Sequence, residues 1–273
     1  MKVITASKIT KTVADLCITS NQVLRSDVLK ALQNLCKSEK NARARRILEA
    51  IIANAGMAKS ELLAICQDTG FPIVFLELGQ DVRISGDLNQ AVQRGIESGY
   101  KKGSLRDSIV KDPLERGKPG FNPGIMHVDI TRGNKLKITV LPKGFGCENK
   151  SQMKMFLPTA KLAQIKEFII DAVKAAGPDA CPPYVVGVGI GGTADYAAFL
   201  AKKALLRKLR TRSSKLEKDL LSRVNKLNIG PMGLGGSATC LAVNIETYPT
   251  HIAGLAVAVN ISCHALRSAT AIL

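Results

Sequence analysis

The stretch YVVGVGI at residues 184–190, followed by Gly191, Gly192 and Thr193, decides the fold class of this 273-residue chain. Its seven uncharged residues predict a strand. The glycine pair predicts a turn, and the residues beyond it have the spacing of a helix. A strand that turns directly into a helix is typical of folds in which helices pack against a sheet.

Patterns on both sides of this stretch add further helices and strands. Apolar residues recur at three- and four-residue spacing over residues 1–65, which predicts a helical N-terminal region. Alternating apolar residues flank Arg132-Gly133-Asn134 and predict a β-hairpin. Further strands are predicted at 71–78, 240–245 and 255–261, and further helices at 86–100 and 159–176. We therefore expect a mixed α/β (α+β) fold, with residues 1–273 forming one domain.

Composition and cysteine usage narrow the class of protein. A hydrophobic content of 46% allows a substantial core. Lys8, Lys11 and Asp15 interrupt the N-terminal stretch before a secretory signal could form, and no apolar run approaches the roughly 18 to 20 residues of a membrane helix. Seven cysteines without an export signal argue against a disulfide framework. We expect a soluble, cytoplasmic protein with reduced thiols and no membrane partner.

About half of the net charge of +17 lies in one segment, residues 202–226. This segment holds ten Lys or Arg side chains against Glu217 and Asp219, and its leucines repeat at helical spacing. The simplest interpretation is a basic helix with one solvated face. Nucleic-acid binding is the alternative, but an aromatic content of only 4% offers few side chains on which bases could stack.

Glycines at the end of the 184–190 stretch also match a dinucleotide-binding pattern. Gly187, Gly189 and Gly192 satisfy G-x-G-x-x-G between a predicted strand and a predicted helix. An acidic residue about 20 positions further on is expected at such a site, and the sequence there is basic. A nicotinamide enzyme is therefore a minor alternative, and we expect the glycines to allow close approach of the backbone to an anion or a cluster.

Three of the cysteines stand beside turn residues or polar residues. They are Cys66 before Gln67-Asp68-Thr69-Gly70, Cys181 before two prolines, and Cys263 after Ser262. No C-x-x-C pair is present, so zinc-ribbon and ferredoxin motifs are excluded. A position at the edge of a strand or helix lets a thiolate face a cavity, although a small buried thiol is also a common core residue.

Several short motifs together resemble the α subunit of class I fumarase and the closely related tartrate dehydratase, over nearly the whole chain. The matching stretches are CQDTG at 66–70, LRDS at 105–108, KGFG at 143–146, ACPPY at 180–184, IGGT at 190–193, GPMGLGG at 230–236, THIA at 250–253 and SC at 262–263. Their shared order makes the resemblance far more specific than any one motif.

The resemblance implies that Cys66, Cys181 and Cys263 ligate a [4Fe-4S] cluster whose fourth iron is open to substrate. Soft thiolate donors select such a cluster, and an unligated iron acts as a Lewis acid. The implied activity is reversible hydration of fumarate to malate, with tartrate to oxaloacetate as the close alternative. Cys17, Cys36 and Cys240 are expected to be core thiols.

The resemblance also implies roles for polar residues around the cluster. Asp68 and His251 are the expected catalytic residues, with His251 near the cluster. Gln67 and Arg106 are expected to bind the substrate, Arg106 as a clamp on a carboxylate. Lys143 and Gly146, together with Gly191, Gly192, Gly235 and Gly236, are expected to form the backbone walls of the pocket.

One departure from the family pattern and one partner complete the expectations. Cys147 stands where the family more often has a small hydroxyl residue, and it would be a spare thiol near the cluster or a competing ligand. The family's remaining substrate clamps and proposed base lie in a separate β region. We therefore expect a β subunit as partner, in an α2β2 assembly that acts on a small dicarboxylate.

Overall fold

The computed structural model describes residues 2–209 and 213–273, and the chain divides into two compact units. Unit 1 comprises residues 1–25, 55–144 and 267–273, and unit 2 comprises residues 26–54 and 145–266. Each unit therefore joins segments that are far apart in the sequence. Helices and mixed sheets occur in both, so the expected mixed α/β (α+β) fold is confirmed.

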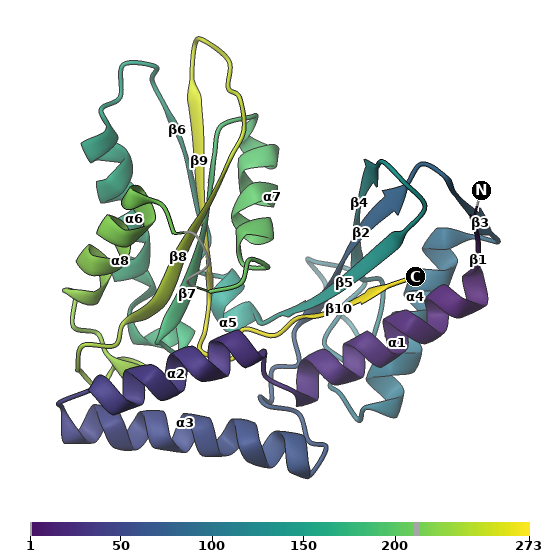
Figure 1. The fold of residues 1–273 in the computed structure, drawn as a ribbon, viewed down its shortest axis with the longest axis horizontal. Helices are drawn as coiled ribbons and strands as arrows, with labels where there is room; N and C mark the ends of the chain where they lie inside the picture. The colour runs from purple at the N-terminus through teal and green to yellow at the C-terminus, as the bar shows by residue number, and fades with distance from the viewer. Residues whose placement is uncertain (1, 210–212) are drawn as a thin grey trace. The chain divides into compact units, whose positions relative to one another are not determined.

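Unit 1 is built on a four-stranded sheet with the strand order β10-β5-β2-β4. Helices α1 and α4 pack together against this sheet (Figure 1). The two helices approach closely because Gly99 has no side chain: a Cβ there would lie 2.6 Å from the Ala14 carbonyl oxygen. The elements are β1 (Lys2–Thr5), α1 (Ala6–Gln22), β2 (Phe71–Gly79), β3 (Val82–Ser85), α4 (Leu88–Lys102), β4 (Ile125–Thr131), β5 (Leu136–Lys143) and β10 (Ala269–Ile272).

The predicted hairpin is wrong, because β4 and β5 do not pair with each other. Strand β2 lies between them, parallel to β4 and antiparallel to β5. The connection between β4 and β5 passes over the end of β2 at Gly79, where a Cβ would lie 2.3 Å from the Gly133 carbonyl oxygen. Burial explains the order: β2 is apolar and largely buried, whereas Ile130 of β4 is largely exposed at the sheet edge.

Unit 2 is built on a second four-stranded sheet, with the order β6-β9-β7-β8. Helix α7 packs on one face through small residues such as Ala201 and Ala258, and α6 and α8 cover the other face over a core that includes Val188 and Val259 (Figure 1). The elements are α2 (Ser26–Ser38), α5 (Phe145–Glu148), β6 (Gln152–Phe156), α6 (Leu162–Ala176), η1 (Gly177–Ala180), β7 (Tyr184–Ile190), α7 (Ala194–Ala204), α8 (Lys215–Asn225), η2 (Pro231–Gly233), β8 (Cys240–Thr247) and β9 (Leu255–Ser262). Helix α3 (Ala42–Ser60) contributes to both units.

The glycines of β7 allow close helix packing. A Cβ at Gly187 would lie 2.1 Å from the Ala201 carbonyl oxygen, and one at Gly189 would lie 2.0 Å from that of Ala197. At Gly191 (φ +96°) a Cβ would lie 1.9 Å from the Tyr248 carbonyl oxygen. We expected these glycines to allow close approach of the backbone to an anion or a cluster. The structure corrects this expectation, because at all three glycines the closely approaching group is the protein's own backbone.

The basic segment 202–226 is two helical pieces rather than one helix. Helix α7 ends at Ala204 and α8 begins at Lys215, and residues 210–212 lie outside the described part of the chain. Arg207 forms a salt bridge with Glu217, at 2.7 Å between Nη1 and Oε1, and its guanidinium also donates to the Ile245 carbonyl. Part of the basic charge therefore holds α8 to strand β8. In the described residues, no helix is long and apolar enough to cross a membrane.

Candidate functional site

The loop of residues 66–70 in unit 1 carries three of the predicted site residues. It leads directly into β2, and it leaves Gln67 exposed with Cys66 and Asp68 partly exposed. The Cys66 thiol donates to Gln67 Oε1 at 3.2 Å, and Asp68 Oδ1 accepts from the Gly70 amide at 2.9 Å. Gly70 has φ +77°, and a Cβ there would lie 2.6 Å from the Pro142 carbonyl carbon. The motif therefore needs glycine at its last position.

Buried side chains hold the carbonyl groups of this loop. The Tyr100 hydroxyl donates to the Thr69 carbonyl at 2.9 Å and to the Gly70 carbonyl at 3.0 Å, and Arg267 Nη2 donates to the Asp68 carbonyl at 2.7 Å. Burial raises the pKa of Tyr100 well above its ordinary value, so its hydroxyl stays a proton donor. Three consecutive carbonyls are thereby fixed from the interior of unit 1.

Arg106 lies beside the same loop. Its backbone amide donates to Thr69 Oγ1 at 3.1 Å, and its side chain is exposed. An exposed guanidinium on a residue whose backbone bonds this loop suits a clamp on a substrate carboxylate. Lys143, at the end of β5, pairs in register with Phe71, the residue after the loop, and its side chain is buried. The structure thus brings Gln67, Asp68, Arg106 and Lys143 to one part of unit 1.

Unit 2 brings Cys181 and Cys263 together. Cys263 follows the last residue of β9, and His264 donates its backbone amide to the Cys181 carbonyl at 3.3 Å. His264 Nδ1 lies 3.1 Å from the same oxygen, which can only accept, so Nδ1 carries the proton. Cys181 has φ 54° in the left-handed region, a conformation that costs a residue with a side chain roughly 1 kcal/mol. Backbone strain of this kind is concentrated at functional sites.

Cys147 is next to this pair but is part of the core. It lies in α5, it is buried, and its thiol donates to the Ala180 carbonyl at 3.4 Å. Ala180 is the residue before Cys181, so Cys147 is a neighbour of one predicted ligand. Gly146 of the same short helix is exposed.

The glycine-rich loop 230–236 lies at the same end of the unit 2 sheet. Met232 donates its amide to the Pro182 carbonyl at 2.9 Å, which places the loop beside Cys181. Ser237, which follows the loop, donates through its amide and its hydroxyl to Glu39 Oε2, at 2.9 and 2.8 Å. Burial alone would raise the pKa of Glu39, but hydrogen bonds from Asn41 and Ser237 outweigh it and hold that pKa below its usual range. Glu39 is thus an ionised anchor for the loop.

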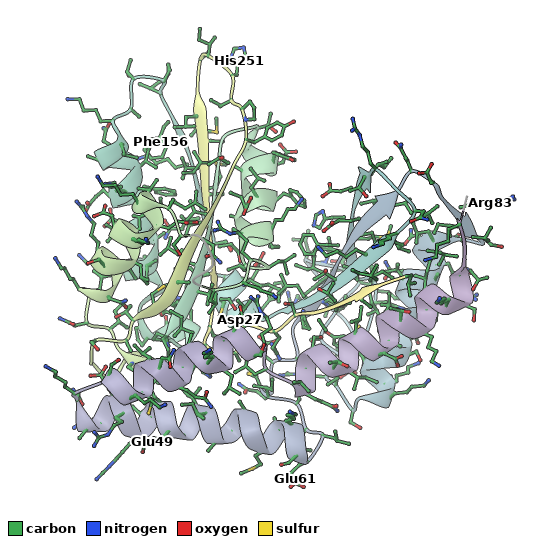
Figure 2. All side chains as sticks on the ribbon, viewed as in Figure 1. Asp27, Glu49, Glu61, Arg83, Phe156 and His251 are labelled. Atoms are coloured by element: carbon green, nitrogen blue, oxygen red, sulfur yellow. The ribbon has the colours of Figure 1, made fainter. Side chains whose placement is uncertain are left out.

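His251 lies at the opposite end of the same sheet. Figure 2 shows it at the tip of the loop that joins β8 to β9, whereas Cys263 follows the last residue of β9. Eight residues of strand span about 26 Å at roughly 3.3 Å per residue. The expectation that His251 lies near Cys181 and Cys263 is therefore not met within unit 2. Gly191 and Gly192 lie at the His251 end, since Gly192 donates its amide to the Pro249 carbonyl at 3.0 Å.

Cys17 and Cys240 differ in burial from the three predicted ligands, whereas Cys36 does not. Burial raises the pKa of Cys17 and that of Cys240 to about 12, so both remain protonated core thiols at neutral pH, as expected. Cys36 is instead partly exposed on α2, so its assignment to the core is wrong. Cys66, Cys181 and Cys263 are all partly exposed, and each lies outside or at the end of a regular element.

The donor set fits an iron-sulfur cluster in its chemistry. Thiolates are the ligands that such clusters take, and a partly exposed thiol is deprotonated more readily than a deeply buried one. Neither unit alone holds all three cysteines, because Cys66 belongs to unit 1 and the other two belong to unit 2. In residues 2–209 and 213–273, no group of three or more His, Cys, Asp or Glu side chains could hold a metal ion.

Sequence reasoning missed four residues that support the site: Tyr100, Arg267, His264 and Glu39. Each acts through a hydrogen bond to a segment at least 30 positions away in the chain. The only signal in the sequence was the position of His264 directly after a predicted ligand. The other three gave no local signal, because their roles depend on tertiary packing.

Comparison with known proteins identifies the family. A family model described as fumarate hydratase (Fumerase) matches residues 10–272. A protein of Methanocaldococcus jannaschii named putative L(+)-tartrate dehydratase subunit alpha is 39% identical over 275 residues, covering 96% of each chain. The L(+)-tartrate dehydratase subunit alpha of Escherichia coli K12 is 29% identical, covering 97% of this chain and 90% of the relative. The predicted resemblance is confirmed, and the chain belongs to the fumarate hydratase (Fumerase) family of hydro-lyases.

Proposed function

We propose that this chain is the iron-sulfur-binding α subunit of a two-subunit hydro-lyase that catalyses the reversible hydration of fumarate to malate. The observation that carries the proposal is the 66–70 loop, which presents Cys66, Gln67 and Asp68 beside Arg106 on a rigid support in unit 1. A thiol, an amide, a carboxylate and a guanidinium together can hold a cluster and a dicarboxylic acid.

Cys66, Cys181 and Cys263 are the proposed ligands of a [4Fe-4S] cluster. When bound, the cluster supplies an iron with a vacant position, a Lewis acid toward the carboxylate and hydroxyl oxygens of the substrate. Residues 1–273 would then act as one catalytic domain. The neighbouring Cys147 is a spare thiol in this proposal, because its sulfur donates to the Ala180 carbonyl within the core.

The polar residues of unit 1 are assigned to binding and proton handling. Arg106 holds one carboxylate of the substrate through paired N–H donors, and Gln67 donates its amide to an adjacent oxygen. Asp68 exchanges a proton with the substrate, and the Gly70 amide bound to its Oδ1 fixes the carboxylate orientation. Lys143 and Gly146 contribute backbone to the wall of the pocket.

His251 remains a proposed proton-handling residue with a different position. Its Nδ1 accepts from the Ala253 amide at 3.1 Å, so the neutral ring carries its proton on Nε2. At the tip of the β8–β9 loop, this imidazole can serve only a substrate that reaches the His251 end of the sheet.

Dehydration of tartrate to oxaloacetate is the second candidate activity. The specific observation in its favour is the name of the relatives, which are tartrate dehydratase α subunits at 39% and 29% identity. Dehydration of malate, the reverse of fumarate hydration, and dehydration of tartrate both remove water from a hydroxylated dicarboxylate, so the same clamp and cluster serve either one.

The proposed partner is the β subunit, in an α2β2 complex in the cytoplasm. The relatives' names include the term subunit alpha, which supports a second kind of chain. In this proposal the β subunit supplies the remaining substrate clamps and the base that the resemblance assigns to it.

The test of the proposal is the iron and sulfide content of the chain after anaerobic purification, with visible absorbance and turnover of the α–β pair. We expect Cys66→Ala, Cys181→Ala and Cys263→Ala each to lose the cluster, and Cys36→Ala on the exposed face of α2 to keep it. Fumarate, malate and tartrate are then compared as substrates. Full iron content in all three ligand variants, or no turnover of any of the three acids, would overturn the proposal.

A further inference from the structure

Arg267 is a buried cation at the start of the last segment of unit 1. Its side chain is only 3% exposed. Nη1 donates to Asn21 Oδ1 at 3.0 Å and Nη2 donates to the Asp68 carbonyl at 2.7 Å. Within the described residues, no carboxylate forms an ion pair with Arg267, and its Nε has no hydrogen-bond partner. The guanidinium is therefore buried with only part of its hydrogen-bonding capacity used.

Burial of such a group needs a structural reason. Removing a charge from water is unfavourable unless a partner compensates, and here both partners are neutral carbonyl oxygens. A fork of planar N–H donors bonds two acceptors in fixed directions, which neither lysine nor an apolar side chain does. The two acceptors are Asn21, near the end of α1, and Asp68, in the 66–70 loop. Arg267 thus connects the loop to the helix that supports it.

Arg267 and Tyr100 hold different carbonyl groups of the 66–70 loop. Tyr100 holds the carbonyls of Thr69 and Gly70, so Arg267 is the side chain that holds the next carbonyl toward Cys66. Gly144 lies on the other side, where a Cβ would be 3.2 Å from Asp68 Oδ2 and 3.8 Å from Arg267 Nη2. The backbone at Asp68 therefore depends on Arg267 alone among these donors.

We propose that Arg267 is a positioning residue that fixes the backbone of the 66–70 loop, and through it the Asp68 carboxylate and the Cys66 thiol. The inference rests on the proposed function for the roles of Asp68 and Cys66. It assigns Arg267 no contact with the substrate. In the sequence, Arg267 follows Cys263 by four residues, and it is the first residue of the last segment of unit 1. This segment therefore supplies the support for the 66–70 loop, which contains Cys66.

The competing explanation is that Arg267 only stabilises the fold at the C-terminal strand. Thr270 is the matched control for it, because it lies three residues further on in β10 and pairs with Thr139, with 2.9 Å between the hydroxyl oxygens. Thr270→Val removes a hydrogen bond of the same strand without touching the loop. A purely structural role predicts that Arg267→Met lowers stability without raising amide exchange in the 66–70 loop more than in β5.

The experiment compares wild type, Arg267→Met, Arg267→Lys and Thr270→Val as complexes with the β subunit. Three kinds of measurement are made: iron and sulfide content per chain, amide exchange of a peptide spanning 63–72 against one spanning 136–143, and steady-state kinetics for kcat and KM. Arg267→Met should raise exchange in the loop peptide about fivefold or more and leave the β5 peptide unchanged. It should lower kcat roughly 10- to 100-fold with a smaller change in KM, because a misplaced reacting group loses rate more than binding.

Partial rescue by lysine distinguishes positioning from general destabilisation. In Arg267→Lys the ammonium can donate to the Asp68 carbonyl but cannot also reach Asn21 with the same geometry, so kcat should recover to within about tenfold of wild type. Thr270→Val should keep kcat, KM and iron content. If Arg267→Met does not fold, Arg267→Lys and Asn21→Ala carry the comparison, with smaller changes confined to the loop peptide.

Outcomes that overturn the inference are distinct from those that overturn the proposed function. Unchanged loop exchange in Arg267→Met, or equal losses in Arg267→Met and Thr270→Val, sinks the positioning role even if the enzyme is active. If wild type holds no cluster and turns over none of the acids, the proposed function fails. The exchange comparison then still decides whether Arg267 fixes the loop.

Discussion

The two ends of the unit 2 sheet hold their loops in different ways. At the end where β9 finishes, Glu39 bonds Ser237 across 198 residues of chain, and Met232 bonds Pro182. At the end where β9 begins, the tip closes on itself: Thr250 Oγ1 donates to the Gly254 carbonyl and the Ala253 amide donates to His251. The first end is tied together by distant segments. At the second end, within the described residues, a distant segment bonds only as far as Pro249, through the Gly192 amide, and the side-chain hydrogen bonds of the tip at residues 250–254 are local.

This difference separates two kinds of functional residue. Ligands of a cluster must be held in fixed geometry, which hydrogen bonds from distant segments provide. Local opening of a loop tip that is held by local hydrogen bonds needs little free energy. A side chain there acts only on a molecule that binds at the tip. Cys181 and Cys263 lie at the first kind of end and His251 at the second, so the proposed chemistry of unit 2 is divided between its ends.

The largest expected effect on the free energy of unfolding is at Gly189, one of the glycines of β7 that pack against α7. In Gly189→Ala the new Cβ would lie 2.0 Å from the Ala197 carbonyl oxygen, so strand and helix must separate along the whole sheet. We expect a loss of about 3 kcal/mol or more in the free energy of unfolding. Urea denaturation measures it, with Gly56→Ala in α3 as the control.

Gly56 has open space around it, so its replacement should be neutral or stabilising by roughly 0.5–1 kcal/mol. A Gly189→Ala protein of normal stability would contradict the packing role. If that protein had also lost affinity for a nicotinamide cofactor, the dinucleotide interpretation of the motif would return.

The next largest effect concerns the anchor of the cysteine end. Glu39→Ala leaves the Ser237 amide and hydroxyl without their acceptor in a site where Glu39 is only 4% exposed. A loss of about 1–3 kcal/mol is expected, because buried donors lose their partner. Amide exchange should rise in residues 230–237 but not in residues 248–254. The comparison of the two ends fails if both loops loosen equally.

Acid should weaken the cysteine end through the same carboxylate. Hydrogen bonds hold the pKa of Glu39 below its ordinary value of 4.5, so the native state binds a proton less readily than the unfolded chain. Its stabilisation is complete above that ordinary value and is lost as the pH falls through the native pKa. Urea unfolding at pH 7, 4 and 3 measures it, and Glu39→Gln should flatten the acid limb.

Glu167 on the exposed face of α6 provides the control, since Glu167→Gln should keep the wild-type dependence on pH. Glu217 adds to the same limb, because hydrogen bonds from Ser214, Ile245 and Arg207 outweigh its burial and lower its pKa. An acid limb that persists in full in the double variant Glu39→Gln, Glu217→Gln would contradict this account.

Local patterns in the sequence predicted most regular elements and the loop motifs. The apolar stretch of β7, the strand β2 and the helices α4 and α6 are present near their expected positions. Pairing was not predictable in the same way: adjacent strands β4 and β5 looked like a hairpin, yet the more apolar β2 occupies the place between them. Strand order depends on competition for burial among segments far apart in sequence, which no local pattern records.

The candidate site also contains residues that local motifs predicted and residues whose positions depend on tertiary structure. The resemblance named Cys66, Gln67, Asp68 and Arg106, which lie close together in unit 1 because the Thr69 side chain bonds the Arg106 backbone. The THIA motif at 250–253 did not predict that His251 lies at the opposite end of β9 from Cys263. No motif revealed Arg267 either, whose hydrogen bonds in the described residues are to Asn21 and Asp68, 246 and 199 residues away.

The smallest expected effect on stability is at His251. Its side chain is exposed and its one hydrogen bond in the described residues is to the Ala253 amide, so His251→Asn should change the free energy of unfolding by less than about 0.5 kcal/mol. Iron and sulfide content should equal that of wild type, because Cys181 and Cys263, the proposed ligands in unit 2, lie at the other end of the sheet. A loss of kcat in this stable, cluster-loaded variant would assign His251 to proton handling. A loss of the cluster would contradict the separation of the two ends, since nothing at a locally bonded tip should reach Cys181 or Cys263 through the same unit.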